Sequence, residues 1–252
     1  MIDLSAWPHF ALLLVRPSLL VATAPPFGGI YTPARVKIGL STILALLLMP
    51  VVPMPRGLAG ADLVAVVARE VLIGLALGMS VRLLLAGVEL AGQLASFQLG
   101  FSYAATVDPQ TGARSNLLGA FFGSLAMLVF LLVNGHHRVV RALVGSYTAL
   151  PIGFGHVDPQ LAALVARMLG VVFVLGVQLA APVVIVLLVV ELALGLVSRA
   201  APSLNLMASG FAVRSLVGLA VLSLMVSVIP GVVTRAIPSV IELAAHLALL
   251  FR

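Results

Sequence analysis

The sequence predicts an all-α polytopic membrane protein, and its composition carries most of that prediction. Apolar residues make up 62% of the 252 positions and charged residues only 9%, and the mean hydropathy is +1.23. A chain of this composition has too few polar residues to coat the surface of a soluble globule. Since one helical crossing of a bilayer uses about 20 apolar residues, about six apolar segments fit into the chain.

The positive charge of the chain does not indicate a nucleic-acid site. The net charge is +6, but the 14 Lys and Arg residues are scattered singly, and only Arg35 with Lys37 and Arg138 with Arg141 come close together. Charges at the loops and helix ends of a membrane protein explain this pattern better than a site for a polyanion. The absence of cysteine excludes disulfides, Cys-ligated zinc and a thiol nucleophile.

Clusters of proline and glycine divide the first half of the chain into three apolar segments. The first covers residues 10–24 and ends at the breakers PPFGG, residues 25–29. The second covers residues 36–52 and ends in a proline-rich loop. The third, residues 63–95, would be roughly 50 Å long as one helix, against about 30 Å for the hydrocarbon core of a bilayer. We therefore expect it to tilt, kink or leave the bilayer.

Charged residues are unusually frequent in this third segment. It contains Arg69, Glu70, Arg82 and Glu89, and each charge at the centre of a lipid-facing helix costs about 3 kcal/mol even on the mildest scale. Arg82, Glu89 and Gln93 follow at spacings of seven and four, which places them along one stripe of a helix. We expect these charges to face protein or water, with snorkelling of the arginines to the interfaces as the alternative.

Small residues at a spacing of four predict two faces for close helix packing. Gly74 and Gly78 form the first pair, in the third segment. Gly119 and Gly123 form the second, in the uncharged segment of residues 117–133, which has the sequence of an ordinary crossing.

The second half of the chain is also divided by breakers. A shorter helix is expected at residues 139–150. Residues 161–198 are too long for a simple crossing, and Pro182 with three glycines predicts a kinked pair of half-helices. The sixth segment, residues 206–229, is expected to stop at Pro230 and Gly231, and the apolar tail of residues 237–251 to be interfacial or packed on a partner.

A polar, turn-forming stretch, residues 100–116 (GFSYAATVDPQTGARSN), lies between two very apolar segments. Its centre has the residue types of a tight turn, because Asp accepts backbone N–H bonds, Pro fixes φ and Gly adopts positive φ. In lipid such a backbone would be unsatisfied. We expect the stretch to lie in water or to line a cavity enclosed by protein.

No set of residues in the sequence indicates catalysis or a metal site. His136 and His137 are the only histidine pair, and we expect adjacent side chains to diverge on a helix, so a structural turn or helix cap is the better interpretation. No serine lies in a nucleophile motif, and the glycines form neither a dinucleotide-binding nor a Walker loop. We therefore predict a protein that is not an enzyme and has no cofactor.

Four motifs in register resemble the FliR family of flagellar export-apparatus proteins. Their sequences are GFSYA with VDP (residues 100–104 and 107–109), FLLVNGHH (130–137), LPIG (150–153) and LGLVSRAAPSLN (194–205). The resemblance covers nearly the whole chain, in order, spacing and length. Ser198 departs from the family pattern, which has Asn before the Arg. The related SctT family of injectisomes shares the fold and the Asp-Pro loop, but the NGHH and LPxG motifs look more like the flagellar branch.

This resemblance implies a fold, a location and partners. Such proteins join FliP-like and FliQ-like subunits in a helical assembly of kinked hairpins, the type III export gate, in the bacterial inner membrane at the flagellar basal body. The resemblance also implies that much of this assembly sits above the plane expected from hydropathy, on the periplasmic side. Unfolded flagellar proteins pass through this gate, and an FlhB-like switch protein and membrane lipid are further partners. Residues 1–160 resemble a FliP-like part and residues 161–252 a FliQ-like part of a single domain.

The resemblance also implies roles for particular residues. The family's pore plug falls on ten residues, which are Val107, Asp108, Pro109, Gln110, Thr111, Gly112, Ala113, Arg114, Ser115 and Asn116. The inter-subunit or buried charges are Arg82, Glu89, Glu191 and Arg199, and the turn motifs are Asn134, Gly135, His136, His137, Pro151 and Gly153. Two alternatives stay open at this point, an SctT-type subunit of an injectisome and a secondary transporter that uses Glu89 or Glu191 as a substrate or proton site.

Overall fold

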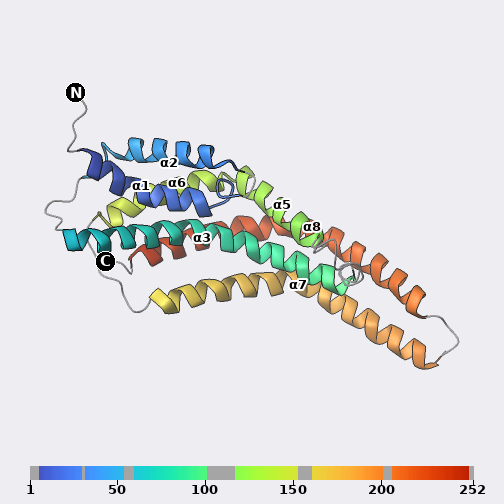
Figure 1. Cartoon of the computed structure of the whole chain (residues 1–252). Helices are drawn as coiled ribbons and strands as arrows, with labels where there is room; N and C mark the ends of the chain where they lie inside the picture. The colour runs from blue at the N-terminus through green and yellow to red at the C-terminus, as the bar shows by residue number, and fades with distance from the viewer. Residues whose placement is uncertain are drawn as a thin grey trace, which may run out of the picture. The chain divides into compact units, whose positions relative to one another are not determined.

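The protein is all-helical over the part of the chain that the computed structural model describes, namely residues 6–29, 32–53, 60–100, 117–152, 161–200 and 206–249 (Figure 1). This confirms the predicted fold class. The helices there are α1 (Ala6–Thr23), α2 (Ala34–Leu48), α3 (Gly60–Gln98), α5 (Leu117–Leu132), α6 (Gly135–Ala149), α7 (Leu161–Ala200) and α8 (Leu206–Leu249).

The chain folds into two compact units. Unit 1 comprises Met1–Leu84, Phe130–Leu169 and Arg235–Arg252, and unit 2 comprises Leu85–Val129 and Gly170–Thr234. Each unit therefore draws residues from both sides of position 160. The predicted division into a FliP-like and a FliQ-like part describes sequence resemblance. The two compact units do not test it, so it stays a prediction.

In the part of the chain that the structure describes, fewer helices have the length of a membrane crossing than the number of apolar segments suggests. Leu63–Gln98, Ala166–Ala200 and Gly210–Val240 are long and apolar enough to cross a bilayer, and α5 with α6, bent by 67° at their break, would make a fourth as one broken span. The shorter apolar helix Trp7–Thr23 falls below that length. The protein is thus a polytopic helical membrane protein whose segments are not all ordinary crossings.

Most predicted segment ends agree with the helices to within about four residues, but one prediction at a proline needs correction. α8 does not stop at Pro230 and Gly231 but continues to Leu249. α7 is one continuous helix with Pro182 inside it, so the two predicted half-helices are joined, and their kink stays a prediction. A proline removes one backbone hydrogen bond, whereas ending a helix leaves about four N–H and four C=O groups without partners. In apolar surroundings the continuous helix is the less costly choice.

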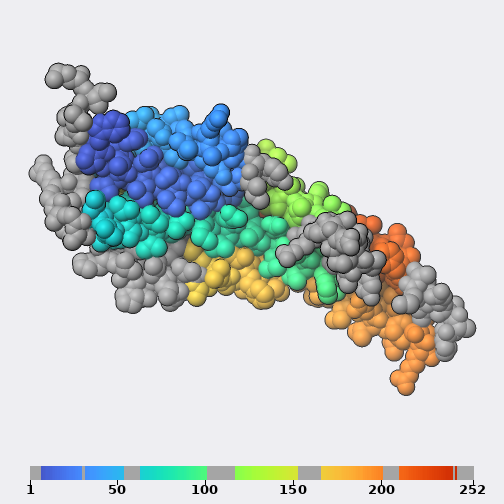
Figure 2. Space-filling model, in the orientation of Figure 1, coloured from blue at the N-terminus to red at the C-terminus, as the bar shows by residue number. Residues whose placement is uncertain are grey.

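Within unit 1, α1 packs closely on α3 through the predicted glycine pair. A Cβ atom at Gly74 would lie 2.9 Å from both the Arg16 carbonyl oxygen and the Leu19 Cβ, and one at Gly78 would lie 3.1 Å from the Leu20 carbonyl oxygen. The two glycines therefore let the backbones of α1 and α3 approach each other. α2 packs along α1, and in Figure 2 the blue α1 and α2 form a continuous surface beside the cyan first half of α3.

Within unit 2, the second half of α3 packs against α5 and α7 through further glycines. A Cβ atom at Gly92 would lie 2.7 Å from the Cα of Gly119 in α5, and one at Gly87 would lie 3.1 Å from the Val172 carbonyl oxygen in α7. α7 and α8 run side by side as an antiparallel hairpin in this unit (Figure 1), and Gly210 of α8 faces Leu194 of α7.

Candidate functional site

The predicted pore plug, residues 107–116, lies outside the described residues, and so does Gly153. The plug stays a prediction. The function expected of this chain depends on how its helices are held together and on which faces they leave open, and the described charged residues and the turn between α5 and α6 bear on both.

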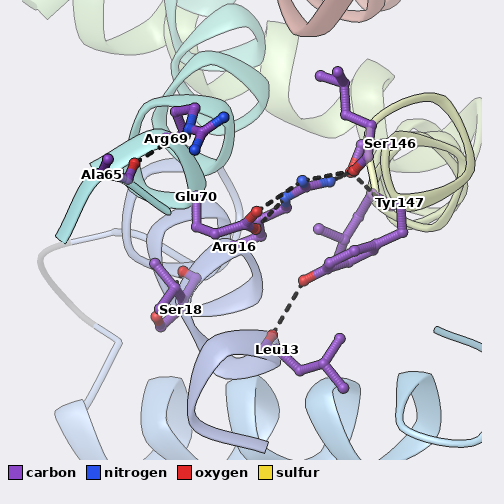
Figure 3. Close-up of polar contacts among 11 residues, drawn as sticks. Leu13, Arg16, Ser18, Ala65, Arg69, Glu70, Ser146 and Tyr147 are labelled. Atoms are coloured by element: carbon purple, nitrogen blue, oxygen red, sulfur yellow. Dashed lines mark hydrogen bonds and ion pairs between the residues drawn. The ribbon is translucent and has the colours of Figure 1, made fainter. Parts of the chain in front are cut away.

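Arg16 and Glu70 form a buried ion pair between α1 and α3 in unit 1 (Figure 3). Only 1% of the Arg16 side chain and 2% of the Glu70 side chain are exposed. The Nε of Arg16 donates to Glu70 Oε2, and its Nη2 donates to Glu70 Oε1 at 2.9 Å. This bidentate geometry is the strongest arrangement of a guanidinium–carboxylate contact.

α6 supplies the remaining partners of the Arg16 guanidinium. Nη1 donates to Ser146 Oγ at 3.1 Å and Nη2 to the carbonyl oxygen of Leu150, just past the end of α6, at 2.8 Å. The cationic carbon lies 4.3 Å from the centre of the Tyr147 ring, and the Tyr147 hydroxyl donates to the Leu13 carbonyl oxygen at 3.1 Å. The network therefore joins α1, α3 and α6 and satisfies both buried charges.

The geometry of this cluster favours a structural role over a chemical one. Both carboxylate oxygens of Glu70 accept from Arg16, so neither points toward an open position. Among the described residues no group of three or more His, Asp or Glu side chains is placed to hold a metal ion. A buried ion pair is costly unless every polar group is satisfied, and here the satisfied groups belong to three different helices.

A second ion pair, in unit 2, joins α7 to α8. Arg214 Nη2 lies 2.7 Å from Glu191 Oε1, and about a third of each side chain is exposed, 33% for Arg214 and 37% for Glu191. Sequence reasoning assigned Glu191 to the inter-subunit or buried charges and did not pair it with Arg214. Within the chain Glu191 already has a partner, and its exposed side stays open to a neighbour.

Unlike Glu70 and Glu191, Glu89 has no ion-pair or hydrogen-bond partner within the described part of the chain. It is half-buried on α3 and lies against Gly123 of α5, whose Cβ position would be 3.9 Å from Glu89 Cβ and Cγ. Arg82 and Arg199 are exposed. None of these three forms an ion pair with another residue that the structure describes, so their role in contacts between subunits stays a prediction.

The predicted turn residues Asn134 and Gly135 lie at the break between α5 and α6. Asn134 has a positive φ of 56°, and a Cβ atom on Gly135 would lie 2.8 Å from Cζ of the Phe130 ring. The rings of His136 and His137 do not diverge as expected, since their centroids are 4.3 Å apart. The prediction was wrong because two adjacent side chains in the first turn of a helix can point toward each other. Pro151 follows the end of α6.

Comparison with known proteins gives one consistent family. The family described as Bacterial export proteins, family 1, matches residues 7–240. The chain is 35% identical over 222 residues to flagellar biosynthetic protein FliR of Bacillus subtilis (strain 168), covering 86% of this chain and 85% of that protein. It is 32% identical over 225 residues to FliR of Escherichia coli (strain K12), covering 88% and 84%. For FliR of Caulobacter vibrioides the values are 34% over 218 residues, 84% and 86%.

Breaking the Arg16–Glu70 pair should destabilise the protein strongly. We expect Glu70→Gln or Arg16→Met to cost about 3–5 kcal/mol each, because either change leaves the other charge buried without its counter-ion. The double variant Arg16→Met/Glu70→Gln should recover much of this loss, since no charge is then buried alone. Thermal unfolding of the purified protein, isolated together with its partner subunits, measures the cycle.

The matched control is Glu191→Gln, which removes a partly exposed ion pair worth about 0–1 kcal/mol. Equal effects of Glu70→Gln and Glu191→Gln, or a double variant as unstable as the sum of the two single ones, would contradict the role given to Arg16 and Glu70.

Proposed function

The chain belongs to family 1 of the bacterial export proteins, and from this membership we propose that it is a subunit of the flagellar type III export gate. The coarser statement, that it is a membrane component of the flagellar export apparatus, rests on the family match over residues 7–240 and on relatives that are FliR proteins. The finer proposal is that it assembles with FliP-like and FliQ-like subunits in the inner membrane at the flagellar basal body. The observation that carries it is the match over most of the chain.

Two features of the structure support a subunit that is incomplete by itself. Within the chain, only 28% of an apolar 18-residue stretch of α7 is buried, and the value for the corresponding stretch of α8 is also 28%. For α3 the buried share is 56%. Such apolar faces need lipid or other helices to cover them. Glu89, half-buried and without a partner in the described part, offers a carboxylate to a basic side chain of a neighbouring subunit.

The ion pairs of Glu70 and Glu191 disfavour a transport site at either residue, and the case against one at Glu89 rests on the family match. A secondary transporter that binds ions or protons near the bilayer midplane needs an ionisable group open to its substrate. Glu70 is fully occupied by Arg16, and Glu191 is paired with Arg214. The relatives carry the flagellar name, which favours the flagellar gate over the injectisome one.

We further propose that residues 107–116 plug the closed gate. The helices on either side of this segment are held together in unit 2, because Gly92 near the end of α3 packs on Leu118 and Gly119 at the start of α5. Gly100, at the C-terminal end of α3, has a positive φ of 79°, a conformation that glycine adopts at little cost and that directs the chain out of the helix. A segment whose flanking helices pack closely on each other suits a plug that substrate displaces.

Replacing residues 107–116 by a short Gly/Ser linker should open the gate to small ions. The expected result is a marked rise in ion leakage through vesicles that contain the complex of this chain with its FliP-like and FliQ-like subunits. The control replaces residues 107–116 by a Gly/Ser segment of the same length, which keeps the length of the plug and removes its sequence. Leakage that stays at the level of the unaltered complex would remove the plug assignment.

Neutralising Glu89 should weaken assembly without unfolding the chain. Glu89→Gln removes a charge that has no partner among the described residues, so we expect the folded chain to persist while less FliP-like and FliQ-like protein co-purifies with it. Glu191→Gln, whose carboxylate is paired inside the chain, is the control and should change co-purification less. If Glu89→Gln left the yield of the complex unchanged, Glu89 would be a solvated or lipid-interface residue instead.

A further inference from the structure

The exposed face of α6 differs in chemistry from the exposed faces of α2, α5, α7 and α8. On those four helices many exposed side chains are large and apolar, for example Leu47, Leu132 and Leu188. The exposed residues of α6, called here the α6 face, are His137, Arg138, Arg141, Val144, Gly145, Thr148 and Ala149. Val144 is the one large apolar side chain in this set. The α6 face is therefore mainly polar and basic.

Helical spacing aligns the charged and small residues of the α6 face in one stripe. Arg138, Arg141, Gly145 and Thr148 follow one another at spacings of three, four and three residues, and residues at these spacings are neighbours on a helix surface. The Arg16 network holds the opposite side of the same helix (Figure 3). The stripe is thus carried by a helix whose inner side is fixed within unit 1.

The two arginines of the stripe have no counter-charge in the described part of the chain. No Asp or Glu occurs in residues 6–53 or 117–152, which contain α1, α2, α5 and α6. Neither Arg138 nor Arg141 forms an ion pair with another described residue, and Glu70 of α3 is already paired with Arg16. The stripe therefore carries two uncompensated positive charges one helical turn apart.

Gly145 leaves an open position in the middle of the stripe. A Cβ atom at this residue would have no described atom within 4 Å, so packing within the described chain does not require glycine here. Glycine inside a helix lowers its stability relative to alanine. A small residue on a helix surface lets the backbone of a second helix come close.

A protein helix with carboxylates fits the α6 face better than lipid does. Acyl chains would meet two arginines and a threonine where they need apolar side chains. Carboxylates three or four residues apart on a facing helix lie on one side of that helix, as the two arginines do on α6. Guanidinium and carboxylate groups form strong, charge-assisted hydrogen bonds.

We propose that the α6 face binds a helix of a neighbouring subunit of the export gate. Two carboxylates of that helix pair with Arg138 and Arg141, and its backbone packs closely at Gly145. The partner helix therefore carries Asp or Glu at two positions three or four residues apart. This inference rests on the proposed function and adds to it the surface and the chemistry by which one partner is recognised.

Reversing the two charges tests the proposal in the co-expressed complex. Arg138→Glu/Arg141→Glu should lower the amount of one partner subunit that co-purifies with the chain by about tenfold or more, because like charges then face each other. Arg138→Lys/Arg141→Lys keeps both charges and should retain most of the binding. Equal co-purification of the Glu variant and the unaltered chain overturns this inference alone. An unaltered chain that binds no partner subunit overturns the proposed function, and this inference with it.

A photo-crosslinking residue on the α6 face identifies its occupant. With benzoylphenylalanine in place of Thr148, irradiation of the purified complex should link the chain to a partner peptide that has two carboxylates three or four residues apart. Changing these two carboxylates to Lys should restore co-purification with the Arg138→Glu/Arg141→Glu variant. A cross-link to lipid alone, a peptide without such carboxylates, or the absence of rescue overturns the proposal.

Filling the open position tests the close approach of the partner helix. Gly145→Leu should leave the fold of the chain unchanged, since nothing described lies near the new side chain, and should lower co-purification severalfold. The matched control is Gly39→Leu in α2, where a Cβ atom also has no described atom within 4 Å. Equal co-purification of the two leucine variants would overturn the packing at Gly145.

Discussion

The buried ion pair between Arg16 and Glu70 is the interaction on which the rest of unit 1 depends. Neither charge could stay in an apolar interior alone, so α1 and α3 must meet at this point, and α6 must supply Ser146 and the Leu150 carbonyl to complete the shell. Gly74 and Gly78 follow Glu70 at spacings of four on the same face of α3. The residues that let the helices approach and the residue that holds them therefore share one stripe.

Some groups of the protein have partners within the chain and others have none in the described part, and this difference indicates a subunit of a larger assembly. Inside unit 1 every charge of the Arg16 network has a partner from the same chain. In unit 2 the apolar faces of α7 and α8 are largely uncovered, and Glu89 has no partner in the described part. Unit 1 is thus held together by contacts within the chain, whereas the apolar faces of unit 2 depend on lipid or neighbouring subunits.

Local patterns in the sequence predicted the helices and the Gly74–Gly78 packing face, but not the Arg16 cluster. Helical periodicity reports on residues a few positions apart, whereas Arg16 is 54 positions from Glu70 and 130 from Ser146. An arginine in the first apolar segment and a glutamate in the third were the available signal. The predicted stop at Pro230 was wrong because the rule that proline ends a helix applies in water, which solvates the free backbone groups of a helix end. The plug residues lie outside the described part.

The most direct test of the central claim, that the chain is a gate subunit and not a self-sufficient transporter, is its behaviour during purification with and without FliP-like and FliQ-like subunits. The account predicts that the chain expressed alone aggregates or unfolds at low temperature, and that co-expression yields a monodisperse complex with a clearly higher Tm, because partners cover the open faces of α7 and α8. A chain that purifies alone as a stable, monodisperse protein, with no gain from the partners, would contradict it.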